Sequence, residues 1–192
     1  MKNDTLIFTA TYNEAQNISN FIDSIYKLNI KADILIIDDN SPDKTWEIVK
    51  KYSTVNENLH LIIRKKKEGL DTAHKFAYKF SRENNYDFLI TLDADFTHSI
   101  NLIPKFITEI KNNDFVIGSR YMKGGKTDMT GWRLLLSYVA NRFIKSVFRI
   151  NCNEFTSSFR AFNLHRLKNF DLNNISSKGY SFFMETIFQI NK

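Results

Sequence analysis

Phe88-Leu89-Ile90-Thr91-Leu92-Asp93-Ala94-Asp95 is the stretch of sequence that decides the fold. Its first five residues are apolar or β-branched, as in a strand that is buried on both faces of a parallel sheet. Asp93 and Asp95 follow directly. Residues i and i+2 at the end of a strand project in the same direction, so these two carboxylates converge. The stretch therefore predicts a buried strand that brings two acidic groups to one edge of a sheet.

Apolar runs of the same kind recur up to Gly118, and between them apolar residues spaced three and four apart indicate helices. Strand and helix therefore alternate. This alternation predicts an α/β fold in which helices cover both faces of a mostly parallel central sheet. The expected strands span residues 6–11, 34–37, 59–63, 88–92 and 115–117, and the expected helices include residues 18–26, 73–80 and 103–110.

The remaining part of the chain is less regular. A glycine-rich turn at residues 123–126 precedes an amphipathic segment, 132–148, that predicts a long helix, and apolar spacing from Phe182 predicts a last helix running to Lys192. No repeat, low-complexity tract or linker divides the sequence. We therefore expect residues 1–192 to form one domain.

The composition is that of a water-soluble globular protein, with 43% hydrophobic and 25% charged residues among 192. The 17 Phe and 8 Tyr supply apolar surface for a core, and the single cysteine, Cys152, excludes an intramolecular disulfide and a cysteine-based zinc cluster. No run approaches the roughly 20 apolar residues of a membrane span, and no secretory signal opens the chain. A soluble, cytoplasmic protein is expected.

The net charge of +6 suggests an anionic partner, although a charge that only aids solubility explains the number equally well. The densest basic run is Arg64-Lys65-Lys66-Lys67, after an expected strand. No base-stacking platform or nucleic-acid motif accompanies this run. A solvated loop or a membrane-facing patch is the favoured interpretation, and nucleic acid is not an expected partner.

Polar residues close three of the expected strands. Asp93 and Asp95 would repel one another without a cation, and their hard oxygen atoms suit Mg²⁺ or Mn²⁺, although an Asp-x-Asp triplet alone is more often a solvated loop. Asp38-Asp39 and Thr11-Tyr12-Asn13-Glu14 end two other strands, and Ser41 is placed to cap a helix beginning at Pro42. Because ligands of parallel sheets bind at the carboxyl ends of strands, these residues predict one ligand crevice.

Six segments follow one another along the chain in a recognisable order: residues 9–18, Asp38 to Asp43, Gly69-Leu70, Asp93-Ala94-Asp95 with His98, Gly118 to Tyr121 with Gly124-Gly125, and Gly179-Tyr180 with Glu185. Taken together, they resemble family 2 glycosyltransferases, and within that family the polyprenyl-phosphate (dolichyl-phosphate) mannosyltransferases. The resemblance implies a GT-A fold that binds a nucleotide sugar, and inverting transfer of the sugar to a polyprenyl phosphate.

The resemblance also implies roles for individual residues. Thr11, Tyr12, Glu14 and Asp38 are expected to line the pocket for the base and ribose of the donor. Asp93 is expected to contact the ribose or the water shell of the metal, Asp95 to bind Mg²⁺ or Mn²⁺ directly, and Thr97 to complete the metal site. His98 is interpreted as a supporting loop residue rather than a ligand.

For the acceptor, the resemblance places Arg120 against the donor diphosphate or the acceptor phosphate. Arg133 and Ser137, four residues apart and therefore on one helical face, match a pair that holds the acceptor phosphate. Segment 132–148 carries more apolar residues than one packed side needs. Part of this helix is expected to be exposed and to suit a lipid tail. The alternative is a core helix buried on two sides.

The expected enzyme is thus a metal-dependent glycosyltransferase, with GDP-mannose or a UDP-sugar as donor and a polyprenyl phosphate as acceptor, located on the cytoplasmic face of a membrane. Two alternatives remain. One is a family 2 enzyme that transfers from a UDP-sugar to a lipid or glycan. The other is an inactive nucleotide-binding module that partners a membrane subunit, because similar proteins continue past the helix of Glu185 with a strand and a basic loop, whereas this chain ends at Lys192.

The sequence departs from the family pattern at five positions. Ala10 replaces a proline, Glu154 replaces an aspartate, and Lys44, Asp71 and Ser158 replace glycines. Loss of glycine is costly wherever φ must be positive. The largest effect is expected near Ser158.

Overall fold

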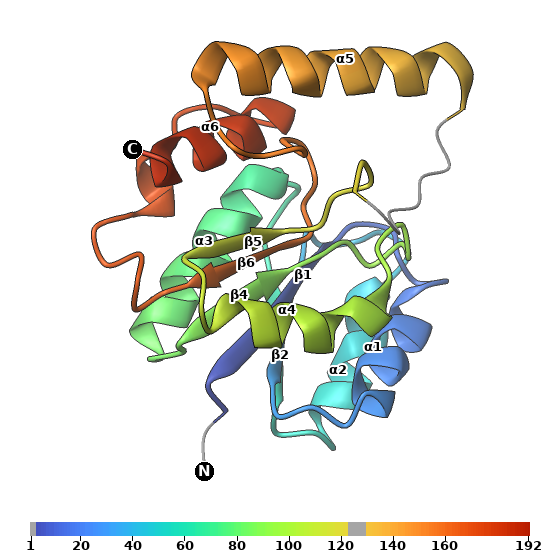
Figure 1. Ribbon diagram of the computed structural model, residues 1–192. Coiled ribbons are helices and arrows are strands. Elements are labelled where there is room, and N and C mark those ends of the chain that lie inside the picture. The colour runs from blue at the N-terminus through green and yellow to red at the C-terminus, as the bar shows by residue number, and fades with distance from the viewer. Residues whose placement is uncertain (1–2, 123–129) are drawn as a thin grey trace.

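The computed structural model describes residues 3–122 and 130–192. At its centre is a six-stranded sheet in the order β3-β2-β1-β4-β6-β5 (Figure 1). The pairs formed by β1 with β2, β1 with β4, and β2 with β3 are parallel, so the expected mostly parallel sheet is confirmed. The strands are β1 (Thr5–Thr11), β2 (Asp33–Asp38), β3 (Leu59–Ile63), β4 (Phe88–Thr91), β5 (Phe115–Ile117) and β6 (Arg160–Asn163).

Helices cover both faces of the sheet, as the alternating sequence pattern predicts (Figure 1). On one face lie α1 (Ile18–Lys27), α2 (Thr45–Ser53) and α4 (Ile103–Ile110), the last preceded by the short helix η1 (Ile100–Leu102). On the other face lie α3 (Leu70–Glu83), η2 (Leu172–Asn174) and α6 (Tyr180–Ile190). The last helix therefore ends two residues before Lys192.

The central strands contribute side chains to two apolar cores, one on each face of the sheet. In β1, Ile7 packs in the core shared with α1, α2 and α4, whereas Leu6 and Phe8 pack in the core shared with α3 and α6. Successive side chains of a strand point to opposite faces, so a strand covered on both faces needs an unbroken apolar run. This requirement explains why the apolar runs locate these strands correctly.

The sequence pattern gives no sign of β6. This strand of four residues begins with a charged side chain, Arg160, and lies between β4 and β5, antiparallel to both. Its amino end therefore lies at the edge of the sheet where the other strands have their carboxyl ends. β6 forms because two neighbouring strands pair with it, which a local pattern cannot reveal.

Helix α5 (Gly131–Phe148) confirms the long helix expected at 132–148. In Figure 1 it lies across one end of the molecule, beside α6. Five of its apolar side chains are 53–67% exposed, which confirms that part of the helix is not buried in a core; they are Leu135, Leu136, Val139, Phe143 and Val147. In the part of the chain that the structure describes, no helix has both the length and the apolar character to cross a bilayer.

The predicted helix start at Pro42 is wrong. Helix α2 begins at Thr45, after Lys44, which adopts a left-handed φ of 62°. The Ser41 hydroxyl, expected to cap the helix, instead donates to Asp38. Of the departures from family glycines, Lys44 takes a positive φ, whereas Asp71 and Ser158 do not. The expected distortion near Ser158 is therefore absent.

Candidate active site

The carboxyl ends of β1, β2 and β4 bring together residues that the sequence predicts to share one crevice. The Thr11 hydroxyl, at the end of β1, donates a hydrogen bond of 2.8 Å to Oδ2 of Asp38, at the end of β2. Asp93 lies two residues beyond the end of β4, the other neighbour of β1. The prediction that Thr11, Asp38 and Asp93 lie at neighbouring strand ends is confirmed.

Asp38 is fully buried and organises the loops around it. Its Oδ1 accepts a hydrogen bond of 2.8 Å from the backbone N–H of Ser41, and its Oδ2 accepts one of 2.7 Å from the Ser41 hydroxyl. The same hydroxyl accepts from the backbone N–H of Asn13 at 3.1 Å. In this arrangement Asp38 holds Thr11 and Ser41 directly, and Asn13 through the Ser41 hydroxyl.

Tyr12 and Glu14 lie in the loop after β1. The Tyr12 ring is 37% exposed, and Nζ of Lys67 lies 3.9 Å from its centre. The backbone N–H of Glu14 donates to the Thr45 hydroxyl at 3.0 Å, while its carboxylate accepts from the Asn17 amide at 2.8 Å. Loop and helix contacts thus hold both residues at the rim formed by the carboxyl ends of β1 and β2.

The basic run after β3 is part of this rim. Arg64 is not a solvated residue as the sequence suggested, because its side chain is only 9% exposed. Its Nε pairs with Asp39, its Nη1 donates to the Thr72 hydroxyl at 2.5 Å, and its Nη2 donates to the Gly69 carbonyl at 3.1 Å. Arg64 thereby anchors the loop that holds Lys67 against the first strand end.

Asp95, Phe96 and Thr97 lie in a turn beyond β4 that is held by hydrogen bonds within it. The backbone N–H and the hydroxyl of Thr97 donate to Oδ1 of Asp95 at 3.0 and 2.7 Å. Phe96 adopts a φ of 62°, a conformation that is costly for a bulky residue and that concentrates at functional sites. The turn leaves Asp95 exposed to solvent.

Asp93 and Asp95 fit a divalent cation by their donor chemistry. Burial raises the pKa of the Asp93 carboxyl, and the nearby Asp95 carboxylate raises it further, against the hydrogen bond from Ser158. A cation relieves both effects because it favours the ionised carboxylates. The described residues contain no group of three His, Cys, Asp or Glu side chains arranged for a metal. Further ligands would therefore be hydroxyl, water or phosphate oxygens, which Mg²⁺ accepts readily.

His98 supports this turn in its neutral form. Burial lowers the pKa of His98 even though the Asp93 and Asp95 carboxylates act in the opposite direction. The neutral ring accounts for both of its contacts: Nδ1 accepts from the backbone N–H of Asp93 at 3.5 Å, and Nε2 faces the Ser157 hydroxyl at 3.4 Å. The Phe159 ring packs against it, with centroids 5.4 Å apart.

The loop after β5 brings two further predicted residues to the same edge. Nε of Arg120 lies 3.0 Å from Oε2 of Glu154, which is completely buried. The next residue, Tyr121, has its hydroxyl 2.5 Å from the hydroxyl of Ser137 in α5. The Arg133 side chain and the predicted turn at 123–126 lie outside the described residues. Ser137 is thus connected to the site through Tyr121.

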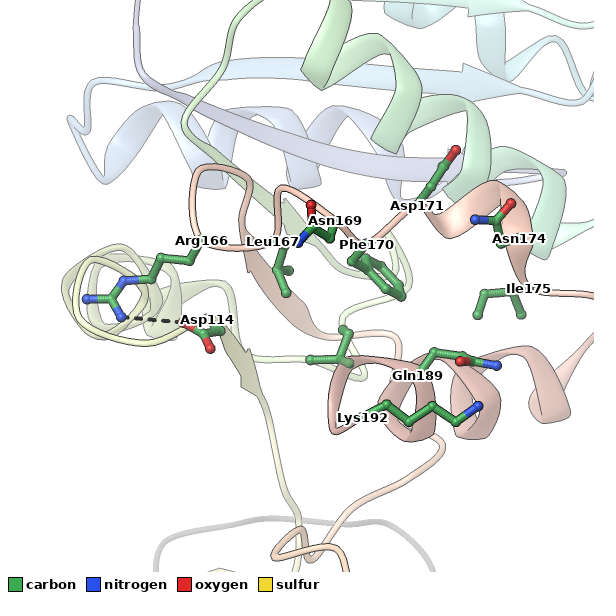
Figure 2. A pocket seen from close by; sticks show the side chains of 11 residues that line it. Asp114, Arg166, Leu167, Asn169, Phe170, Asp171, Asn174, Ile175, Gln189 and Lys192 are labelled. Carbon is green, nitrogen blue, oxygen red and sulfur yellow. Dashed lines mark hydrogen bonds and ion pairs between the residues drawn. The ribbon is translucent and has the colours of Figure 1, made fainter.

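A pocket of about 340 Å³ lies at the opposite edge of the sheet (Figure 2). Asp114, directly before β5, and Arg166, shortly after β6, form an ion pair of 3.4 Å at this pocket. Ile175 and Gln189, from the η2 segment and α6, line it from the other side. No residue that the sequence predicted for the site lines this pocket.

Residues 6–169 match the sequence profile of glycosyl transferase family 2. The chain belongs to this family. It is 29% identical over 187 residues to an undecaprenyl-phosphate mannosyltransferase of Micrococcus luteus, covering 96% of this chain and 76% of the relative. It is 29% identical over 181 residues to a polyprenol monophosphomannose synthase of Mycolicibacterium smegmatis, covering 93% and 68%. The chain is therefore a glycosyltransferase.

The fold is shared with a solved mannosyltransferase from Pyrobaculum calidifontis, in complex with GDP-Man and Mn²⁺. The TM-score is 0.56 at 16% identity, over 88% of this chain and 47% of the solved one. The expectation of a GT-A fold is thereby confirmed.

Two groups that the sequence did not indicate contact residues of the candidate site. Ser157 and Ser158 hold His98 and Asp93, and Lys67 contacts Tyr12. The serines belong to a recognisable motif, but their contacts depend on β6, which the sequence does not indicate. Lys67 lies in a basic run, and its role depends on how Arg64 folds the loop.

Proposed function

We propose that this glycosyltransferase moves a mannosyl group from GDP-mannose to a polyprenyl phosphate at a membrane surface, with inversion at the anomeric carbon. One observation carries the proposal: the same helix, α5, has exposed apolar side chains and also a polar contact with the candidate site. Ser137 bonds Tyr121 on one side of α5, while Leu136 and Phe143 are more than half exposed. Two relatives are an undecaprenyl-phosphate mannosyltransferase and a polyprenol monophosphomannose synthase, which supports a lipid phosphate as acceptor.

The donor is assigned to the strand ends. Tyr12 provides an exposed ring face for the base, and Thr11 and Glu14 flank it. Asp38 acts by fixing Thr11, and Asp93 contacts the ribose or the water shell of the metal. Lys67 adds a positive charge beside Tyr12. This charge favours a nucleoside diphosphate over a neutral nucleoside.

Asp95 is assigned as the direct ligand of Mg²⁺ or Mn²⁺, with Asp93 and the Thr97 hydroxyl beside it. When bound, the cation supplies positive charge that offsets the charge gained by the departing nucleoside diphosphate. The solved mannosyltransferase that shares the fold holds Mn²⁺ together with GDP-Man, which supports a divalent cation in the reaction.

The acceptor needs no protein base. A phosphate monoester has its second pKa near about 6, so it is largely dianionic at neutral pH and already nucleophilic. An acceptor oxygen bonds to the anomeric carbon as the bond from that carbon to the diphosphate oxygen breaks, and the electron pair leaves with GDP. Arg120, Arg133 and Ser137 hold the acceptor phosphate in line for this displacement.

The membrane is approached through α5. The helix contains no acidic residue, and Arg142 and Lys145 accompany its exposed apolar side chains. Apolar burial combined with attraction to anionic lipid is the usual basis of binding by helices that lie in the membrane surface. A location on the cytoplasmic face of a membrane follows from the proposal, because nucleotide sugars are supplied there.

The test is transfer of radiolabelled mannose from GDP-mannose to a polyprenyl phosphate in vesicles, with Mg²⁺ or Mn²⁺. We expect a lipid-linked product, its loss on chelation, and no Mn²⁺-dependent GDP binding in Asp95→Ala. Transfer only from UDP-glucose would move the assignment to another donor. Binding of GDP and Mn²⁺ with no transfer from either donor would contradict the proposed activity.

A further inference from the structure

The register of the sheet places Ser158 opposite Asp93. β4 and β6 pair antiparallel with Thr91 opposite Arg160, and the same register continued by two residues brings Ser158 to Asp93. The Thr91 hydroxyl donates to the Ser158 carbonyl oxygen at 2.5 Å, which keeps the two chains in step beyond the last strand pair. Residues directly opposite one another on antiparallel neighbours have side chains in contact. The position of Ser158 is therefore set by the sheet.

The two side chains are joined by a short hydrogen bond. The buried Ser158 hydroxyl donates to Oδ2 of Asp93 at 2.5 Å. Hydrogen bonds from a hydroxyl to an ionised carboxylate are short and about twice as strong as those between neutral groups. The Asp93 side chain remains 36% exposed, so the carboxylate is held on one side and open on the other.

We propose that Ser158 is a positioning residue for Asp93, whose hydroxyl fixes the carboxylate in one orientation toward the divalent cation or the ribose of the donor. The proposal rests on the proposed function, in which Asp93 contacts these groups. It concerns a position at which this chain departs from the family motif, where a glycine stands. A glycine offers no hydroxyl at this point of the sheet.

A physical effect supports this role. The hydrogen bond restrains the side-chain torsions of Asp93, so fewer conformations are lost when a ligand binds. Groups that orient a metal ligand typically change metal affinity or activity by about 10- to 100-fold when they are removed.

The backbone tolerates the test substitutions. Ser158 has no left-handed φ, so alanine and threonine fit the backbone as serine does. Thr91 bonds the carbonyl of residue 158, so this contact does not involve the side chain that the test replaces. Ser81 is a matched control: it is fully buried in α3, and its hydroxyl donates to the Ala77 carbonyl within the same helix.

The experiment measures Mn²⁺ binding in the presence of GDP by electron paramagnetic resonance, together with kcat and KM for GDP-mannose. Ser158→Ala and Ser158→Gly should weaken Mn²⁺ binding about tenfold or more and lower kcat by more than they raise KM. Ser158→Thr, which keeps the hydroxyl, should stay within about threefold of the native affinity. Ser81→Ala should bind Mn²⁺ normally even if its melting temperature falls.

Three results would overturn the inference, and they differ in what else they rule out. Native Mn²⁺ affinity in Ser158→Ala and Ser158→Gly, with affinity lost in Asp93→Asn and Asp95→Ala, removes the role of Ser158 and leaves the proposed metal site intact. Native Mn²⁺ affinity in all four variants would show that the proposed metal site does not exist. Equal losses in Ser158→Thr and Ser158→Ala would assign the effect to packing and also overturn the inference.

Discussion

Nε of Arg120 lies 3.0 Å from Oε2 of Glu154, a carboxylate with no exposed surface. The other oxygen, Oε1, accepts from the backbone N–H and the hydroxyl of Thr156 at 3.0 and 2.9 Å. The pair therefore joins the loop after β5 to the segment that leads into β6. The Arg120 side chain is 24% exposed, so the pair with Glu154 lies where the protein meets solvent.

Arg120→Ala should lower both stability and activity. Removing one partner of a buried pair leaves the other charge unpaired, and with Arg120 partly exposed we expect a loss of about 1–3 kcal/mol in the free energy of unfolding. Arg120→Lys keeps the charge but loses the Nε geometry, so it should recover most of the stability and little of the transfer rate. Urea unfolding and steady-state kinetics test this. Full activity in Arg120→Lys would show that Arg120 only balances the charge of Glu154.

Lys67→Ala should weaken binding of GDP more than binding of guanosine. The Lys67 ammonium lies 3.9 Å from the centre of the Tyr12 ring, at the rim where the donor is assigned. A single exposed charge near a diphosphate changes affinity by about 3- to 10-fold at low salt, and added salt screens the effect. Calorimetry with both ligands at two salt concentrations measures it. Lys66→Ala, an exposed neighbour, is the control for net charge; equal losses in the two variants would contradict a local role for Lys67.

Much of the sheet could be predicted because its strands other than β6 carry apolar runs, as strands packed between helices do. Strands β1 to β5 all coincide with such runs, and the order of polar strand ends located Thr11, Asp38 and Asp93 at one edge. β6 could not be predicted, because four residues beginning with Arg160 have no strand pattern and pair only through β4 and β5. The predicted start of α2 was wrong because the Ser41 hydroxyl donates to Asp38 and does not cap the helix. Asp38 also joins β2 to β1, and the local sequence does not show such tertiary contacts.

The site was predictable in its residue types and less so in its connections. The acidic residues after β4 are conspicuous in the sequence because carboxylates rarely follow an apolar strand directly. The residues that hold them are not conspicuous, because the contact of Asp93 with Ser158 joins residues 65 apart in sequence. The same holds for Arg64, which is one of four adjacent basic residues. Only the folded loop shows that the Arg64 side chain is buried whereas its basic neighbours are exposed.

His74 should make the protein less stable as the pH falls. The ring is buried among Phe8, Phe182 and Phe183, and burial lowers the pKa of His74 to about 3, with the positive charge of Arg160 acting in the same direction. The unfolded chain takes up a proton near the ordinary pKa of about 6.5 while the folded chain does not. The free energy of unfolding therefore has its full value above that pH. As the pH falls from there to about 3, it decreases by up to about 1.4 kcal/mol per pH unit.

The measurement is the free energy of unfolding in urea between pH 4 and pH 7. His74→Leu, which keeps an apolar side chain in the core, should reduce the slope of stability against pH in this range. Burial also lowers the pKa of His98, so part of the slope should remain in the variant. An unchanged slope would show that His74 is accommodated in its charged form.

Loss of apolar side chains from α5 should release the protein from membranes without affecting the donor site. Leu136 and Phe143 are 56% and 67% exposed, and each contributes apolar surface that a lipid surface would bury. Full burial of such side chains is worth about 1.5–3 kcal/mol each, so Leu136→Ser with Phe143→Ser should weaken vesicle binding by at least about tenfold. Co-sedimentation with vesicles containing anionic lipid measures this, and GDP affinity should be unchanged because Ser137 and Tyr121 keep their contact.

Val55→Ser is the matched control, since Val55 is 78% exposed but lies beyond α2, away from α5. Equal vesicle binding by the double variant and the native chain would show that α5 does not face the lipid, and the exposed apolar face would then require a protein partner.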